Sequence, residues 1–227
     1  MYDPIMKGGK TVQKEREQPI SDTVIKRLPI YLRYLTYLER MGVRTVSSYQ
    51  MGKELGQNPA QIRKDLAYFG EFGRKGIGYE VGYLIKKIRQ ILHLDQLIPV
   101  ALVGAGHLGT ALARYNAFQQ DNMRIVAIFD HSPLKAGRDV DGLKVQPMKE
   151  LKSTIQEKDI RVGIITVPDY AAQEVADQLI EAGVEAIMNF APIIIHTPPN
   201  IRVHHADLTT ELHSLAYYLR QPEYMVN

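Results

Sequence analysis

Residues 98–109 read Ile98-Pro-Val-Ala-Leu-Val-Gly-Ala-Gly-His-Leu-Gly109. The first half of this stretch is apolar and predicts a buried strand over 99–103. The second half is a Gly-x-Gly-x-x-Gly turn, which predicts a helix over 108–118. The next apolar run predicts a strand over 124–129, and Asp130 stands at its end, 21 residues after the last glycine of the turn. A strand, a glycine turn, a helix and an acid at this spacing are typical of a dinucleotide-binding fold.

Each glycine of the turn has a predicted task. Gly104 makes the tight turn, Gly106 lets the backbone approach a pyrophosphate, and Gly109 lets the helix pack on the strand. The carboxylate of Asp130 would bind the adenosine ribose and repel a 2′-phosphate, which favours NADH and NAD⁺ over their phosphorylated forms. The alternative is a glycine turn in an α/β domain that binds no cofactor. The two later strand ends either contact the cofactor or are ordinary loops, since Pro often ends a strand. The predicted cofactor contacts are this turn, the acid and these strand ends: Gly104, Ala105, Gly106, His107, Leu108, Gly109, Asp130, Thr166, Val167, Pro168, Asn189, Phe190, Ala191 and Pro192.

The rest of the second half of the chain continues this alternation. Strands are predicted over 161–166 and 185–189, with a helix over 171–182 between them. We therefore predict an α/β fold in which residues 94–205 form a Rossmann domain, a doubly wound parallel sheet covered on both faces.

The C-terminal segment, 206–227, carries one more predicted helix, over 208–219. Its leucines recur at three- and four-residue steps and make an apolar stripe, which needs a surface to cover. The stripe either packs on its own domain or inserts into a second subunit as a swapped helix.

The first half of the chain, residues 21–93, has the pattern of a winged helix-turn-helix domain. A first helix is expected from Ser21 to Gly42, with a kink or a start at Pro29. Ser47 and Gln50 form a capping box that opens a second, short helix.

The recognition helix follows a short turn. The second helix stops at Gly56, and Asn58 then caps a third helix with Pro59 at its first position. Two helices joined in this way make a helix-turn-helix. A further helix is expected over 81–92, and the glycine-rich residues 70–79 before it predict a hairpin, the wing.

The predicted DNA contacts lie on the capped helix ends, the recognition helix and the wing. Serine hydroxyls and N–H groups suit phosphates, the recognition helix suits a major groove, and basic residues in a wing reach phosphate or the minor groove. A solvated basic face is the alternative for each of them. The residues are Ser47, Ser48, Gln61, Arg63, Lys64, Tyr68, Arg74 and Lys75.

Charge is distributed unequally along the chain. Residues 1–93 carry 17 Lys and Arg against 9 Asp and Glu, a formal charge of +8, whereas residues 94–227 carry 11 against 16, a charge of −5. A basic half suits a polyanion such as double-stranded DNA. Residues 1–20 are polar and aperiodic, which predicts a flexible tail.

Composition narrows the function further. An apolar content of 45% is that of a globular protein, and the absence of Cys rules out disulfides and cysteine chemistry. No apolar run is long enough to span a membrane, so we expect no membrane partner and a cytoplasmic protein.

No group in the sequence suggests catalysis. Two Tyr-x-x-x-Lys spacings, Tyr49/Lys53 and Tyr83/Lys87, precede the glycine turn, whereas short-chain dehydrogenases carry theirs after it. Adjacent His204 and His205 would point to opposite faces of a strand, so they cannot share a metal. We expect no enzyme, no catalytic residue and no metal. Two other hypotheses stay open: an NAD-dependent oxidoreductase, and a DNA-binding regulator that senses another adenine nucleotide such as CoA.

The chain resembles the bacterial Rex family of redox-sensing repressors over about residues 20–220. His107 stands where that family often has Asn, in a turn where the backbone does most of the binding. The resemblance rests on Lys26–Arg33, Val46–Ser48, Ile62–Leu66, Tyr68–Gly70, Lys75–Tyr79, Leu108–Tyr115, Thr166–Pro168, Asn189–Pro192 and Asp207–Leu208.

The resemblance implies a repressor that responds to the NADH/NAD⁺ ratio. It implies a homodimer with swapped C-terminal helices, in which NADH lies between the subunits and closes them. NAD⁺ would compete for the site and favour an open dimer that binds a palindromic operator.

The resemblance also implies roles for single residues. Tyr115 would lie near the nicotinamide, and Phe190 and Pro192 would line its pocket. Asp207 would come from the partner subunit and lie within reach of Arg33. A charge pair made in only one redox state would then switch the dimer.

Overall fold

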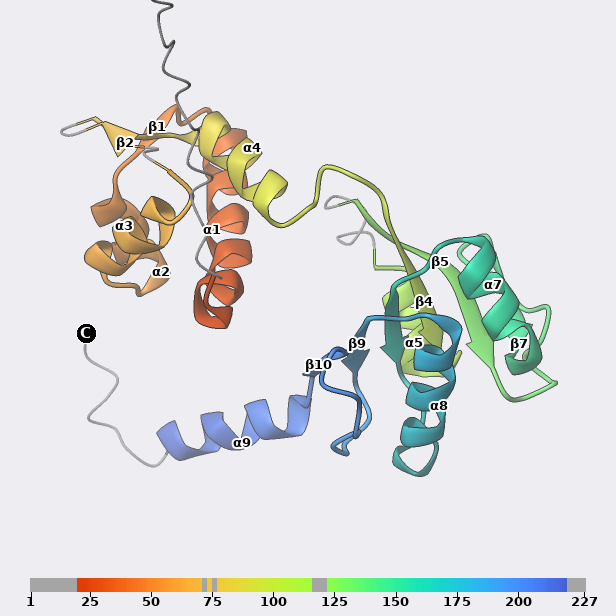
Figure 1. Ribbon diagram of the computed structural model, residues 1–227. Coiled ribbons are helices and arrows are strands. Elements are labelled where there is room, and N and C mark those ends of the chain that lie inside the picture. Colours follow the sequence, from red (N-terminus) through yellow and green to blue (C-terminus); the bar gives the residue numbers. More distant parts are fainter. Residues whose placement is uncertain (1–19, 71–72, 75–76, 116–121, 220–227) are drawn as a thin grey trace, which may run out of the picture. The chain divides into compact units, whose positions relative to one another are not determined.

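The computed structural model describes residues 20–70, 73–74, 77–115 and 122–219 (Figure 1). The chain divides into two compact units, residues 1–93 and residues 94–227. Because the described ranges begin at residue 20, the predicted tail lies almost wholly outside them. Lys75 of the predicted wing and the last eight residues of the C-terminal segment also lie outside them.

The first helix of the N-terminal unit, α1, spans Asp22–Arg40. It begins at the Ser21 cap, so the expectation of a start at Pro29 is wrong; Pro29 lies inside the helix. The helix ends as predicted, because Gly42 adopts a φ of +74° and closes the last turn with its N–H on the carbonyl of Glu39.

Helices α2 (Ser48–Leu55) and α3 (Pro59–Ala67) form the predicted helix-turn-helix. The capping box of Ser47 and Gln50 is present, Gly56 ends α2 with a φ of +62°, and Asn58 caps α3. One face of each of these two helices is buried, and so is one face of α4 (Val81–Ile91). The largest fully buried side chains of this unit are Leu28, Tyr31, Leu35, Met51, Ile62, Leu66, Leu84 and Ile88.

Three short strands complete the winged helix. They are β1 (Thr45–Val46), β2 (Gly73–Arg74) and β3 (Gly78–Glu80), in the order β1-β3-β2 and all antiparallel. The β2–β3 pairing confirms the predicted hairpin, with Arg74 as the last residue of β2.

The C-terminal unit is a seven-stranded sheet in which helices connect some of the consecutive strands. The elements are β4 (Ile98–Val103), α5 (His107–Ala113), β5 (Met123–Asp130), β6 (Asp139–Val140), β7 (Leu143–Pro147), the 3₁₀ turn η1 (Met148–Glu150), α7 (Leu151–Glu157), β8 (Val162–Ile165), α8 (Asp169–Ala182), β9 (Ala186–Asn189), β10 (Arg202–His205) and α9 (Leu208–Tyr218).

The strand order, β10-β9-β8-β4-β5-β7-β6, is that of a Rossmann fold. All neighbouring strands are parallel except β6 and β7, which form a hairpin. The order reverses between β4 and β8, so a crevice for a ligand is expected outside their carboxyl ends. The doubly wound prediction is confirmed. The sequence reading missed β6, β7 and α7, and α5 ends at Ala113 rather than at residue 118.

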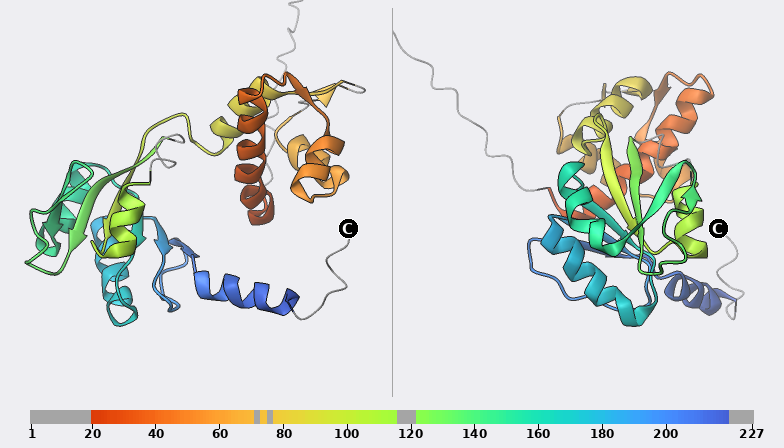
Figure 2. Two further views of the ribbon diagram at one scale, coloured as in Figure 1. Left: turned by 180° about the vertical axis from the view of Figure 1, so that it is seen from behind. Right: turned by 90° about the vertical axis from the view of Figure 1, so that its right-hand side faces the viewer.

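Alternate residues of β4 point into two separate cores. Ala101 and Val103 pack with the buried faces of α7 and α8, whereas Val100 and Leu102 pack on the face covered by α5. The right-hand view of Figure 2 shows the sheet between these two layers. No helix of the described residues is long and apolar enough to cross a membrane.

Helix α9 leaves its apolar stripe uncovered. Leu208, Leu212, Leu215 and Leu219 are each at least 59% exposed. The alternative in which the stripe packs on its own domain is therefore wrong.

Candidate functional site

The glycine turn lies at the carboxyl end of β4, where the strand order reverses. Gly104 has a φ of +109°, and a Cβ atom there would lie 2.6 Å from the carbonyl oxygen of Thr166. A Cβ atom on Gly109 would overlap the carbonyl oxygen of Gly104. A Cβ atom on Gly106, by contrast, would meet nothing within 4 Å. Two glycines are thus required by packing, while the third borders open space that a ligand can enter.

Thr166 ties the two strands of the crevice together. Its N–H donates to the carbonyl of Val103 at 2.9 Å, and its hydroxyl donates to the carbonyl of Gly104 at 2.8 Å. The side chain of Thr166 therefore helps to fix the shape of the turn. The two residues that follow it, Val167 and Pro168, line a cavity beside the turn.

Asp130 is the last residue of β5, and its carboxylate is buried against the turn. Oδ2 accepts hydrogen bonds from the N–H of Ala105 and from Nζ of Lys135, both at 2.8 Å, and Oδ1 accepts from the N–H of Ser132 at 2.9 Å. Burial alone raises the pKa of this carboxyl, but hydrogen bonds from Lys135, Ser132 and Ala105 outweigh it and hold the pKa below its ordinary value. A carboxylate offers about four acceptor positions, so about one is left for a ribose hydroxyl.

A cavity of about 240 Å³ lies between this acid and α8. Its walls combine apolar side chains with a few polar ones, among them Asp130 and Glu174, and ligand pockets commonly have this mixed lining. The residues that line it are Val103, Gly104, Asp130, His131, Met148, Val167, Pro168, Tyr170, Ala171, Glu174, Val175 and Gln178. The open space at Gly106, the free acceptor position of Asp130 and this cavity together fit the adenosine half of a dinucleotide.

Asn189 organises the second predicted strand end. Its Nδ2 donates to the carbonyls of Ala191 and Ile193, its Oδ1 accepts from the N–H of Ala191, and its Nδ2 lies 3.2 Å from Nδ1 of His205. The buried amide of Asn189 thus holds the turn after β9 in shape. Its neighbours face outward to different degrees: Phe190 is half-buried and Pro192 is exposed.

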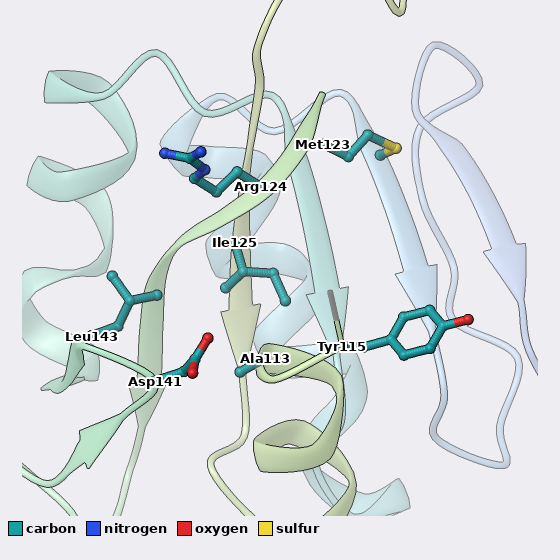
Figure 3. Close-up of a pocket in the computed structure, with 7 residues that line it drawn as sticks. All are labelled: Ala113, Tyr115, Met123, Arg124, Ile125, Asp141 and Leu143. Atoms are coloured by element: carbon teal, nitrogen blue, oxygen red, sulfur yellow. The ribbon is translucent and has the colours of Figure 1, made fainter. Parts of the chain in front are cut away.

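Tyr115 follows α5 and is 56% exposed. It borders a cavity of about 210 Å³ that is also lined by Ala113, Met123, Arg124, Ile125, Asp141 and Leu143. Figure 3 shows the ring of Tyr115 directed away from Asp141 and Leu143, with its hydroxyl outward.

The two predicted switch residues lie in different units. Arg33 is exposed on α1. Asp207 is the N-cap of α9: its carboxylate accepts from the hydroxyl of Thr210 at 2.7 Å and from the N–H of Thr209 at 2.9 Å. The hydroxyl and the N–H of Thr210 and the N–H of Thr209 lower the pKa of Asp207. The capping role was not predicted, and the Arg33–Asp207 pair stays a prediction.

Six of the eight predicted DNA-reading residues lie on α3, at its C-cap Tyr68 or at the N-terminus of α2; Arg74 lies on β2, and Lys75 is outside the described residues. Arg63 donates from Nη1 to the hydroxyl of Ser48 at 3.0 Å, so a residue of the recognition helix meets the start of α2. Lys64 and Tyr68 are exposed. The N–H and the hydroxyl of Ser47 both serve the capping box.

A buried acid on the recognition helix was missed by the sequence reading. Asp65 is fully buried and accepts hydrogen bonds from Arg27 (Nε, 2.6 Å), the hydroxyl of Tyr31 (2.7 Å) and Nε2 of Gln61 (2.7 Å). Gln61, predicted to read DNA, thus has its amide held by Asp65. The only signal in the sequence was an Asp beside Ile62 and Leu66 on an otherwise apolar face.

Within the described part of the chain, no three His, Asp or Glu side chains are placed to hold a metal ion.

Two family models match the chain. One, described as a CoA binding domain, matches residues 95–193. The other, described as the N-terminus of a putative DNA-binding protein, matches residues 19–67.

Curated relatives match over nearly the whole chain. A protein of Brevibacillus brevis named redox-sensing transcriptional repressor Rex is 59% identical over 90% of this chain and 99% of its own length. A protein of the same name from a Roseiflexus species is 48% identical over 90% of this chain and 93% of its own.

Solved structures match over the same range. The structure of RSP in complex with β-NAD⁺ and operator DNA superposes with a TM-score of 0.85 and 35% identity, covering 91% of this chain and 95% of that one. The structure of RSP with β-NADH gives a TM-score of 0.83 and 33% identity, over 91% of this chain and 97% of that one.

Proposed function

Because the chain belongs to the Rex family of redox-sensing transcriptional repressors, we propose that it represses transcription from operator DNA and is released when NADH binds. It is a regulator and not an enzyme, because the relatives whose sequences it matches are named transcriptional repressors. The observation that carries the proposal is the match, over 91% of this chain, to RSP, a Rex-family repressor that was solved with β-NAD⁺ and operator DNA.

The nucleotide contacts follow from the geometry of the crevice. The backbone of the glycine turn around Gly106 would take the pyrophosphate, and Asp130 would accept a ribose hydroxyl. Val167 and Pro168 would border the adenine, while Phe190 and Pro192 would lie toward the nicotinamide. Thr166 and Asn189 support this site by holding the two strand ends, because their side chains bond to the backbone.

The DNA contacts follow from the helix-turn-helix. Arg63, Lys64 and Tyr68 would face the major groove from α3, since their side chains are exposed there. Ser48, beside Arg63, would bind a phosphate, and Arg74 with Lys75 would reach the backbone or the minor groove from the wing. Gln61 would contribute the part of its amide that Asp65 does not hold.

The dimer is part of the proposal. The uncovered stripe of α9 supports a homodimer in which the two helices are swapped, and a two-fold dimer requires a palindromic operator. Sedimentation should give the mass of two chains; a mass of one chain would contradict the swap. We propose that the dimer functions without a metal ion.

We propose that the protein acts in the cytoplasm, where bacterial DNA lies, because the relatives are bacterial.

One specific observation favours a second candidate effector. The model described as a CoA binding domain matches residues 95–193, and CoA shares the adenosine that the cavity suits. The function would then be DNA binding controlled by a CoA-type ligand.

A titration of a labelled palindromic duplex tests the proposal. Fluorescence anisotropy is followed at one fixed salt concentration, because phosphate contacts make affinity steeply salt-dependent. We expect release by NADH but not by NAD⁺. Release by CoA alone would favour the second candidate, and a duplex that never binds would remove the repressor.

Two variants test whether the recognition helix is the surface that binds DNA. Arg63→Ala should weaken DNA binding by about tenfold while leaving NADH affinity unchanged, since it removes a groove or phosphate contact. Lys152→Ala removes an exposed charge from α7 in the other unit and should change neither.

A further inference from the structure

The carboxylate of Asp130, which would bind the adenosine ribose, is paired with a lysine. Nζ of Lys135 lies 2.8 Å from Oδ2 of Asp130, and the carboxylate is only 3% exposed. The backbone holds this pair in place, because the N–H groups of Ala105 and Ser132 bond to the same carboxylate. Lys135 itself sits in the turn after β5, where its N–H donates to the carbonyl of Ser132 at 3.1 Å.

Such a pair changes how the site treats a second negative charge. An isolated carboxylate repels a neighbouring phosphate with an energy that falls off as the inverse of distance. A compensated pair acts as a dipole, whose field falls off faster, and a lysine also offers three donors to phosphate oxygens. The side chain of Lys135 is 34% exposed, so solvent and a ligand can both reach it.

We propose that Lys135 determines how strongly the site distinguishes nucleotides with a phosphate on the adenosine ribose from those without one. Its ammonium offsets the charge of Asp130, so the carboxylate disfavours NADPH less than the position of the acid alone indicates. The inference rests on the proposed function, since it concerns the nucleotide site of that function. It refines the expectation that Asp130 excludes a 2′-phosphate by charge.

Lys135→Gln tests the inference with the least disturbance, because an amide still donates to Asp130 but carries no charge. The affinities of NADH and NADPH are measured by calorimetry at low salt. We expect the ratio of NADH affinity to NADPH affinity to rise about tenfold, because one compensating charge is removed next to the phosphate. The rise should shrink at high salt, since salt screens the interaction.

Two controls separate charge from structure. Lys135→Arg keeps the charge and should leave the ratio near that of the wild type, even if both affinities change. Lys144→Gln breaks an exposed lysine–carboxylate pair with Asp139, 3.6 Å apart, in the nearby hairpin, and should leave the ratio unchanged.

The outcomes are distinct. If Lys135→Gln weakens NADH and NADPH equally, Lys135 only supports the fold and the inference is overturned. Affinities for NADH and NADPH that both stay at the wild-type values overturn it as well, while the proposed function survives both results. If the wild-type protein binds no NADH, the proposed function fails, and the inference that rests on it fails too.

Discussion

The three glycines of the nucleotide turn illustrate how much depends on single atoms. Gly104 and Gly109 have no room for a Cβ atom, because the backbone of Thr166 and that of Gly104 occupy the space. Gly106 has room, because the space beside it is open. Residues with the same side chain are thus required for two different reasons, folding and ligand access.

This difference leads to a prediction. Gly106→Ala should fold with nearly wild-type stability but lose NADH binding, because its methyl group would stand where the pyrophosphate approaches. Gly109→Ala, in contrast, should lower the free energy of unfolding by about 1–3 kcal/mol, because its methyl group has no space. Thermal denaturation and NADH titration of both variants measure the two effects. A Gly106→Ala variant with wild-type NADH affinity would show that the ligand does not approach there.

In the N-terminal unit, a salt bridge joins α1 to α3. Its partners are far apart in the sequence, so no local sequence pattern predicts it. Asp65 of α3 accepts two hydrogen bonds from the guanidinium of Arg27 and one from Tyr31, both on α1. Burial raises the pKa of Asp65, but the bonds from Arg27, Tyr31 and Gln61 outweigh it and lower the pKa below its ordinary value. This contact sets the orientation of the recognition helix on α1.

Asp65→Asn should therefore destabilise the protein, by about 3–5 kcal/mol at neutral pH, because Arg27 loses its buried counter-charge. The folded pKa of Asp65 is lowered, so its stabilisation is complete above the unfolded pKa of about 4 and is lost as pH falls through the lower, folded value. Urea denaturation followed by circular dichroism should show the gap between wild type and variant narrowing in acid. Glu54→Gln, an exposed change on α2, is the control. A gap that does not depend on pH would mean that packing, not charge, holds the two helices.

At the scale of the whole molecule, one chain joins a basic unit for DNA to an acidic unit for a nucleotide. In the proposed dimer, the signal between them requires a contact that differs between two states. The predicted contact is between Arg33 and Asp207, yet Asp207 already caps α9. Replacing it with Ala would remove a charge and a cap together, and the two effects could not be told apart.

Asp207→Asn separates them, because Asn caps helices about as well as Asp but carries no charge. We expect Asp207→Asn to keep the helix content of the wild type and to need on the order of tenfold more NADH to leave DNA. Asp207→Ala should lose helix content as well. The measurements are circular dichroism and the anisotropy titration. Wild-type release from Asp207→Asn would rule out the charge pair as the switch.

Local features of this protein could be predicted from its sequence because they involve neighbours in the chain. The capping box of Ser47 and Gln50, the Asn58 cap and the glycine turn all depend on groups within about five residues of one another. The parallel sheet followed from the alternation of apolar strands and amphipathic helices. Short elements without such a pattern, β6 and β7, were missed.

The contacts that shape both candidate sites were decided by tertiary structure. Thr166 bonds to Gly104 across 62 residues, and Arg27 bonds to Asp65 across 38. Lys135 is only five residues from Asp130, but it reaches the carboxylate because the turn after β5 folds back on the strand end. A sequence shows which side chains exist and how they repeat. The packing of the elements decides which side chains meet at a buried carboxylate. A carboxylate that is removed from water must be paired with donors, whereas an exposed one need not be.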